Sequence, residues 1–99
     1  MRIILEYLDR IEDELCNAKE YAEFHLLYKA DNNAEWSERY KEMADDELKH
    51  AKNINEVVTQ KIKELKRVYN PPEKMQDIWN NRLAKYMEQA QFIKEMLSK

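Results

Sequence analysis

Two short breaks divide this chain into three long stretches in which apolar residues recur every three or four positions. The first break, Asp-Asn-Asn at 31–33, contains residues that favour turns and cap helix starts. Asn32 together with Glu35 resembles a capping box in which Asn replaces the usual Ser or Thr. The second break, Asn-Pro-Pro-Glu at 70–73, must end a helix because proline lacks the amide donor and restricts the residue before it. The spacing predicts helices at about 3–30, 34–69 and 73–97.

The composition favours helices over sheets with tight turns. The 99 residues include no glycine and only two prolines, which are adjacent, and 43% of the residues are apolar. This length fits a single domain, 1–99, with a modest core. Because the first connection is short, the first two helices are expected to be antiparallel neighbours. We therefore expect an all-α fold consisting of a long antiparallel helical hairpin and a third helix.

Charge and cysteine content argue against several classes of protein. Charged residues make up 37% of the chain and give a net charge of only −3, whereas a nucleic-acid surface is usually basic. The basic residues at 61–67 form a short cluster near a predicted helix C-terminus, where they complement the helix dipole. No apolar run is long enough to span a membrane, and the N-terminal segment reaches an acidic residue too early for a signal peptide. The single cysteine, Cys16, favours a reducing compartment, so we expect a cytoplasmic protein.

The first and third predicted helices each carry one apolar stripe at helical spacing. The stripe of the first helix consists of Ile4, Leu8, Ile11, Leu15, Ala18, Ala22 and Leu26. The stripe of the third helix consists of Met75, Trp79, Leu83, Tyr86, Ala90, Ile93 and Leu97. In its second half the first helix is apolar over a wider arc, so this end is expected to touch a third helix or another subunit.

The second predicted helix carries a stripe that two polar residues interrupt. At helical spacing this stripe consists of Trp36, Tyr40, Met43, Glu47, His50, Ala51, Ile54, Val58, Ile62 and Leu65. A helix turns by about 100° per residue, which places Glu47 near the centre of the stripe and His50 one turn away on the same face. A carboxylate directed into a core is costly unless something pairs with it. A metal ion would pair with both residues, whereas the simpler alternative is a salt bridge from Glu47 to Lys19 or to a partner chain.

Glu14 lies at the edge of the first apolar stripe. In an antiparallel hairpin that turns near 31–33, Glu14 lies opposite His50 or a near neighbour. Glu14, Glu47 and His50 are therefore expected to converge at one level of the bundle, where two carboxylates and an imidazole can ligate an ion. Taken singly, a glutamate such as Glu14 more often faces water, and a histidine such as His50 is more often a hydrogen-bonded structural residue.

The first predicted helix also holds a tyrosine, a histidine and a cysteine, whose side chains can hydrogen-bond or bind metal. Tyr21 lies two turns after Glu14 near the same face, so it can hydrogen-bond a ligating carboxylate. The alternative is that Tyr21 is a core aromatic residue whose hydroxyl reaches solvent. His25 lies about three turns from Glu14, too far to share an ion with His50, and we interpret it as structural. Cys16 lies off the stripe and is not counted as a ligand.

The segment from Glu14 to Ile54 resembles the first helical hairpin of the ferritin-like superfamily, and of rubrerythrin-type sequences in particular. In those proteins one helix supplies a glutamate, and the next supplies Glu-x-x-His about thirty-odd residues later. Here Glu47 follows Glu14 by 33 residues, and the motif at 47–51 reads Glu-Leu-Lys-His-Ala. Tyr21 and Phe24 are similar to aromatic positions of that hairpin. The resemblance covers about 40 residues.

The chain departs from this family in carrying half of the ligand set. A ferritin-like domain has four core helices in one chain, with a second glutamate and a second Glu-x-x-His in its second helix pair. The third predicted helix here offers no acid on its apolar face. Short ferritin-like proteins of the encapsulated type are similar in this respect, and dimerisation completes their metal site. The resemblance thus implies a four-helix bundle made by two copies, with Glu14, Glu47 and His50 of each as ligands.

Two hypotheses from different classes stay open at this point. The resemblance implies a homodimer or larger homo-oligomer that holds a di-iron centre, and manganese or zinc suits the same oxygen and nitrogen ligands. For iron, the family implies ferroxidase-type oxidation of Fe(II) in iron handling or oxidative-stress defence. The alternative is a helical interaction module, such as an accessory or phage-type protein, in which the same three residues form a polar layer that specifies pairing.

Overall fold

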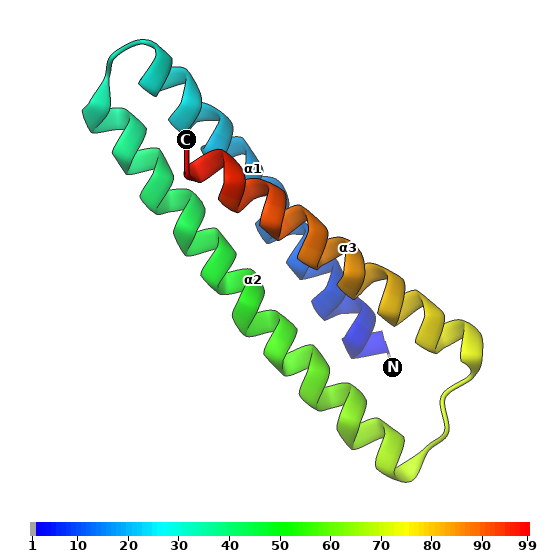
Figure 1. The fold of residues 1–99 in the computed structure, drawn as a ribbon. Helices are drawn as coiled ribbons and strands as arrows, with labels where there is room; N and C mark the ends of the chain where they lie inside the picture. The colour runs from blue at the N-terminus through cyan, green and yellow to red at the C-terminus, as the bar shows by residue number, and fades with distance from the viewer. Residues whose placement is uncertain (1) are drawn as a thin grey trace.

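The structure, a computed structural model, describes residues 2–99 as three α-helices without a strand in that range. α1 spans Arg2–Ala30, α2 spans Ala34–Val68 and α3 spans Glu73–Leu97. Each observed bound lies within one residue of its prediction, so the all-α prediction is confirmed. The molecule is a rod of 55 × 17 × 17 Å in which α1 and α2 form an antiparallel hairpin and α3 runs beside α1 in the same direction (Figure 1).

Two asparagines form the turn between α1 and α2. Asn32 adopts a φ of 58°, a left-handed conformation that asparagine tolerates better than most residues. Asn33 is the N-cap of α2, and its side chain accepts a hydrogen bond from the Trp36 backbone N–H at 3.2 Å. The predicted capping box at Asn32 and Glu35 is therefore wrong. Asn32 is needed for the turn itself, and the Glu35 side chain pairs with Arg39 at 3.0 Å instead.

The Asn-Pro-Pro segment ends α2 as predicted. Tyr69 has an extended backbone, with φ −153° and ψ 141°, while its N–H still donates to the Leu65 carbonyl at 3.0 Å. Pro72 directly precedes the first residue of α3. The Gln76 side chain donates to the Pro71 carbonyl at 2.8 Å, which ties the connection to the first turn of α3.

Small side chains form the contact between α1 and α2. Ala18 and Ala22 on α1, and Ala44 and Ala51 on α2, are completely buried. Small residues at a helix contact let the two backbones approach closely. The apolar stripes predicted for α1 and α3 are buried or half-buried throughout, so those two predictions are confirmed.

The stripe predicted for α2 is wrong in its first half. The fully buried positions of α2 are Ser37, Ala44, Leu48, Ala51 and Val58. Trp36 and Met43 are 44% and 40% exposed, and Glu47 lies at the edge of the core instead of its centre. Three of these buried positions hold Ala or Ser. A stripe drawn through the large apolar residues therefore marks the adjacent, partly exposed face of α2 instead of its buried face.

α3 packs against the side of α1 that faces away from Glu14. Arg82 of α3 pairs with Asp9 at 2.6 Å and with Glu12 at 2.9 Å. At about 100° per residue, Asp9 and Glu12 lie on the opposite side of α1 from Glu14. Desolvation by itself lowers the pKa of Arg82, but its hydrogen bonds to the two carboxylates outweigh this effect and the net pKa is raised.

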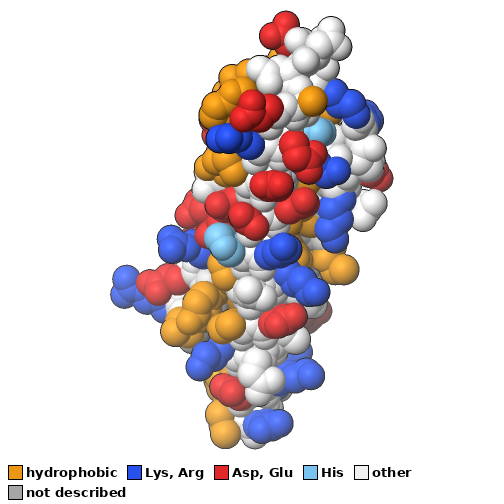
Figure 2. All heavy atoms as spheres, turned by 90° about the vertical axis from the view of Figure 1, so that its left-hand side faces the viewer, with side chains coloured by type: hydrophobic (Ala, Val, Ile, Leu, Met, Phe, Trp, Pro, Cys, Tyr) orange, Lys and Arg blue, Asp and Glu red, His pale blue; other side chains and the backbone are white. Residues whose placement is uncertain are grey.

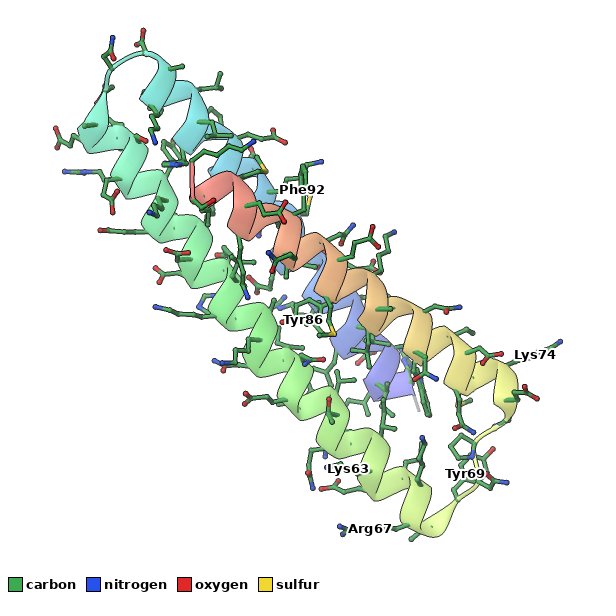
Figure 3. All side chains as sticks on the ribbon, viewed as in Figure 1. Lys63, Arg67, Tyr69, Lys74, Tyr86 and Phe92 are labelled. Atoms are coloured by element: carbon green, nitrogen blue, oxygen red, sulfur yellow. The ribbon has the colours of Figure 1, made fainter. Side chains whose placement is uncertain are left out.

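α3 contacts α2 much less than it contacts α1. Tyr86 extends from α3 into the space between these two helices (Figure 3), where burial and then the Glu56 carboxylate raise its pKa. At the far end of α2, Lys63 and Arg67 point away from the bundle, as expected for solvated residues near a helix C-terminus (Figure 3). Over residues 2–99, no helix combines the length and apolar character needed to cross a bilayer.

Replacing Arg82 with alanine should loosen α3 from α1, because Arg82 joins them through two carboxylates. We expect the free energy of unfolding to fall by about 1 kcal/mol, the upper end of the range for partly exposed ion pairs. Urea unfolding followed by circular dichroism measures the change. Arg2→Ala is the control, since it removes only an exposed pair with Glu6 within α1. Equal losses in the two variants would contradict the role given to Arg82.

Candidate metal site

Glu14, Glu47 and His50 lie together on the face of the hairpin that α3 leaves uncovered. Each residue offers one ligand atom, and these three atoms lie within 4.8 Å of one another. His50 Nδ1 lies 3.5 Å from Glu14 Oε2 and 3.9 Å from Glu47 Oε2. The structure therefore brings together the three residues that the sequence indicated.

The antiparallel pairing of α1 and α2 determines the height along the bundle at which these three residues meet. Glu47 and His50 are three positions apart on α2, so both project from one side of that helix. Glu14 projects from the facing side of α1, because the two helices are antiparallel around the turn at 31–33. Ala18 and Ala51, each one turn from the cluster, are completely buried. Small buried side chains such as these keep the two helices close, so the short glutamate side chains can reach one another.

The two carboxylates are largely shielded from water, whereas the imidazole is not. The side chains of Glu14 and Glu47 are 16% and 19% exposed, and that of His50 is 56% exposed. Glu47 Oε2 is buried and has no hydrogen-bond partner. A buried polar atom without a partner is costly, and a bound cation would remove that cost.

The neighbouring groups raise the pKa of Glu47 above the usual value for glutamate. The Glu14 side chain has the largest effect, because only a protonated Glu47 can donate a hydrogen bond to it, followed by partial burial and by repulsion from the Glu14 charge. The His50 imidazole lowers the pKa of Glu47, but by less than these effects, and Asp46 adds a small rise. The cluster therefore disfavours a negative charge on Glu47 unless a cation is close by.

The cluster lies within a stripe of partly exposed residues that runs along both helices of the hairpin. We call this surface the open face. On α1 it consists of Tyr7, Arg10, Glu14, Tyr21, Phe24 and Tyr28. On α2 it consists of Trp36, Tyr40, Met43, Glu47, His50, Ile54 and Val57. Figure 2 shows acidic side chains and a histidine midway along the rod, with hydrophobic side chains above and below them along one edge.

Aromatic residues form the part of the open face nearest the α1–α2 turn. The Tyr40 ring lies 5.1 Å from Phe24, 5.6 Å from Tyr28, 6.1 Å from Tyr21 and 6.3 Å from Trp36, measured between ring centroids. Within residues 2–99 no hydrogen bond joins Tyr21 to Glu14 or Glu47, and its role at the carboxylates stays a prediction. Its ring packs against Tyr40 because both residues lie two turns from the carboxylates in the same direction.

The other residues considered in α1 are separate from the cluster. His25 is buried, and its Nδ1 lies 2.9 Å from both the carbonyl and the hydroxyl oxygen of Ser37, which confirms its structural interpretation. The sequence pattern gave no indication of Ser37, whose hydroxyl also donates to the His25 carbonyl. Cys16 is exposed, away from the cluster. Lys19 is also exposed, and within the described residues no ion pair joins it to Glu47.

The donor set suits a divalent cation. Two carboxylate oxygens and one imidazole nitrogen are ligands that iron, manganese and zinc all accept. These ions take four to six ligands, so three side chains leave positions for water or for a second set of residues. The unpartnered Glu47 Oε2 is the atom that a cation would satisfy first.

No protein-family model, curated protein or solved structure matches this chain. A proposal for its function therefore has to rest on the cluster and on the surface around it.

Glu47→Gln should stabilise the metal-free protein at neutral pH. The raised pKa of Glu47 means that folding penalises its charged form, so stability is greatest below the unfolded-state pKa and falls as pH rises through the folded-state pKa. The advantage of glutamine should thus be present at pH 7.5 and vanish below about pH 4.

Melting temperatures measured in EDTA between pH 3.5 and 8 test this expectation. Glu42→Gln, at an exposed position of the same helix, is the matched control and should show no such trend. A lower melting temperature for Glu47→Gln at pH 7.5 would contradict the electrostatic argument.

Proposed function

We propose that this protein is a ferritin-like metal-binding protein that holds a dinuclear carboxylate centre between two copies of its hairpin. The observation that carries the proposal is the buried, unpartnered Glu47 Oε2 beside Glu14 and His50. Two copies would contribute four carboxylates and two imidazoles. Those are the ligands of di-iron carboxylate bundles, in which two helices each give a Glu and two others each give Glu-x-x-His.

The open face supports a second copy of the chain as the partner. On α2 this face extends about 16 Å before Glu47, to Trp36, and about 15 Å after it, to Val57. A patch with the ligands at its midpoint can meet its own copy around a two-fold axis. In that antiparallel arrangement the aromatic half of one hairpin covers the aliphatic half of the other, and the two ligand clusters meet at the axis.

The charge of such a site requires cations. Four carboxylates gathered in a water-poor interface repel one another strongly unless positive charge lies between them. We propose iron as the metal, with manganese or zinc suited to the same ligands. In the iron form the protein would oxidise Fe(II) with oxygen or peroxide, in iron handling or oxidative-stress defence in the cytoplasm.

A non-catalytic interaction module is the alternative function. His50 lies within 4 Å of both carboxylates, so a protonated imidazole can balance part of their charge without a metal. In that case the three residues form a polar layer that specifies how two surfaces pair. Such a module would bind no metal, and its association would not depend on added Fe(II).

Removing one carboxylate should abolish metal binding. We expect the unaltered protein to bind about one Fe(II) per chain under anaerobic conditions, and Glu47→Ala to bind none, because the remaining two ligands hold a divalent ion weakly. Metal analysis after desalting measures the stoichiometry. Glu42→Ala removes an exposed carboxylate from the same helix and should keep the metal. Unchanged metal content in Glu47→Ala would refute the assignment.

A charge placed on the open face should break the dimer. Met43→Glu puts a carboxylate at a position that the partner would cover, so we expect the dissociation constant to rise at least about tenfold. Met87→Glu is the matched control, because Met87 is an exposed methionine of α3, outside the open face. Sedimentation equilibrium of the metal-loaded proteins measures both constants. A dimer that survives Met43→Glu but not Met87→Glu would place the interface elsewhere.

A further inference from the structure

Arg10 is the basic residue closest to the carboxylates of the candidate site, apart from His50. Its Nε lies 3.8 Å from Glu14 Oε1, and His50 Nδ1 lies 3.5 Å from the other oxygen, Oε2. Each oxygen of Glu14 therefore has a nitrogen beside it. Glu47 has only His50 near it, with Nδ1 3.9 Å from an Oε2 that is buried and accepts no hydrogen bond, and no ion pair within residues 2–99 joins it to an arginine or lysine. The positive charge of Arg10 thus acts on one ligand of the cluster more than on the other.

Arg10 also lies on the open face, one helical turn before Glu14. Its side chain is 67% exposed, so it can leave Glu14 without disturbing the core. The order of the pair, with arginine four residues before glutamate, is the weaker order for stabilising a helix. The Arg10–Glu14 pair therefore adds little to the stability of α1, which does not explain why an arginine lies on this largely apolar surface.

We infer that Arg10 is a built-in counter-ion for Glu14, which neutralises this carboxylate in the metal-free protein and is displaced when a divalent cation binds. The inference rests on the proposed function, since it concerns the same cluster. It adds a residue outside the ligand set that regulates how readily the set takes up metal.

The charges of the cluster give the physical reason. Across two copies, the four ligand carboxylates carry four negative charges, and two divalent cations neutralise them completely. Two arginines held at the same oxygens would leave an excess of two positive charges, so they must move away. A guanidinium keeps its proton at any physiological pH, and only movement removes its charge. A monovalent cation brings no more charge than Arg10 itself, so displacement favours divalent ions.

Binding of Mn²⁺ by the full-length protein tests the displacement. Isothermal titration at one protein concentration compares the unaltered chain with Arg10→Met, Arg10→Lys and Arg2→Met. We expect Arg10→Met to bind Mn²⁺ about three- to fivefold more tightly, because the competing charge is gone. Arg10→Lys should restore the affinity of the unaltered protein. Arg2→Met changes the net charge equally and removes a pair of the same order, Arg2 with Glu6, so it should change the affinity less than about twofold.

Melting temperatures of the metal-free protein in EDTA test the counter-ion role independently. Arg10→Met should lower the melting temperature when Glu14 is present and leave it unchanged in the Glu14→Gln background. Mn²⁺ binding that Arg10→Met strengthens no more than Arg2→Met does would overturn the inference while leaving the proposed function intact. Absence of Mn²⁺ binding in every variant, the unaltered chain included, would refute the proposed function and displacement by metal with it.

Discussion

The close contact of α1 and α2 through alanines is the constraint on which the rest of the structure depends. Ala18 and Ala22 of α1, and Ala44 and Ala51 of α2, lie in the interior of the hairpin, and all four are completely buried. Because these side chains are small, the hairpin is filled without the large apolar residues of the first half of α2. Those residues lie instead on the open face, where only another surface can cover them. Small buried side chains between α1 and α2 thus have two effects. They make the hairpin narrow, and they leave an apolar surface that nothing within residues 2–99 covers.

The same contact brings the carboxylates of Glu14 and Glu47 together. Their proximity, with partial burial, raises the pKa of Glu47 and leaves its Oε2 without a hydrogen bond. A protein that lacked any use for this arrangement would gain stability by replacing Glu47 with a neutral side chain. The cost is offset in part by nitrogen atoms on either side of Glu14, from Arg10 and His50. A divalent cation would offset it fully, which links the electrostatic strain of the empty cluster to the proposed function.

The sequence predicted those features that depend on spacing along the chain. Breaks at 31–33 and 70–73 determine the helix bounds, and an antiparallel hairpin then places Glu14 level with His50. Features that depend on which face is buried were predicted less well. The interior of the hairpin holds Ala and Ser at key positions, so Trp36 and Met43 suggested the wrong face of α2. Tyr21 was given two interpretations, a hydrogen bond to a carboxylate or a core aromatic role, and its ring packs against Tyr40, two turns from the carboxylates. The role of Arg10 depends on distances between side chains, which spacing does not supply.

The position of α3 is compatible with the proposed site, in which a three-helix chain would supply half of the ligands. Arg82 joins α3 to Asp9 and Glu12, on the side of α1 away from Glu14, so α3 supports the hairpin from behind. If α3 packed against the open face instead, its apolar stripe would cover the ligand cluster, and it carries no carboxylate there to complete the site. Support from the back allows the hairpin to be stable while its ligand face stays accessible. Association of two open faces would then require no rearrangement of α3, and the free energy of metal binding could go directly into holding the two copies together.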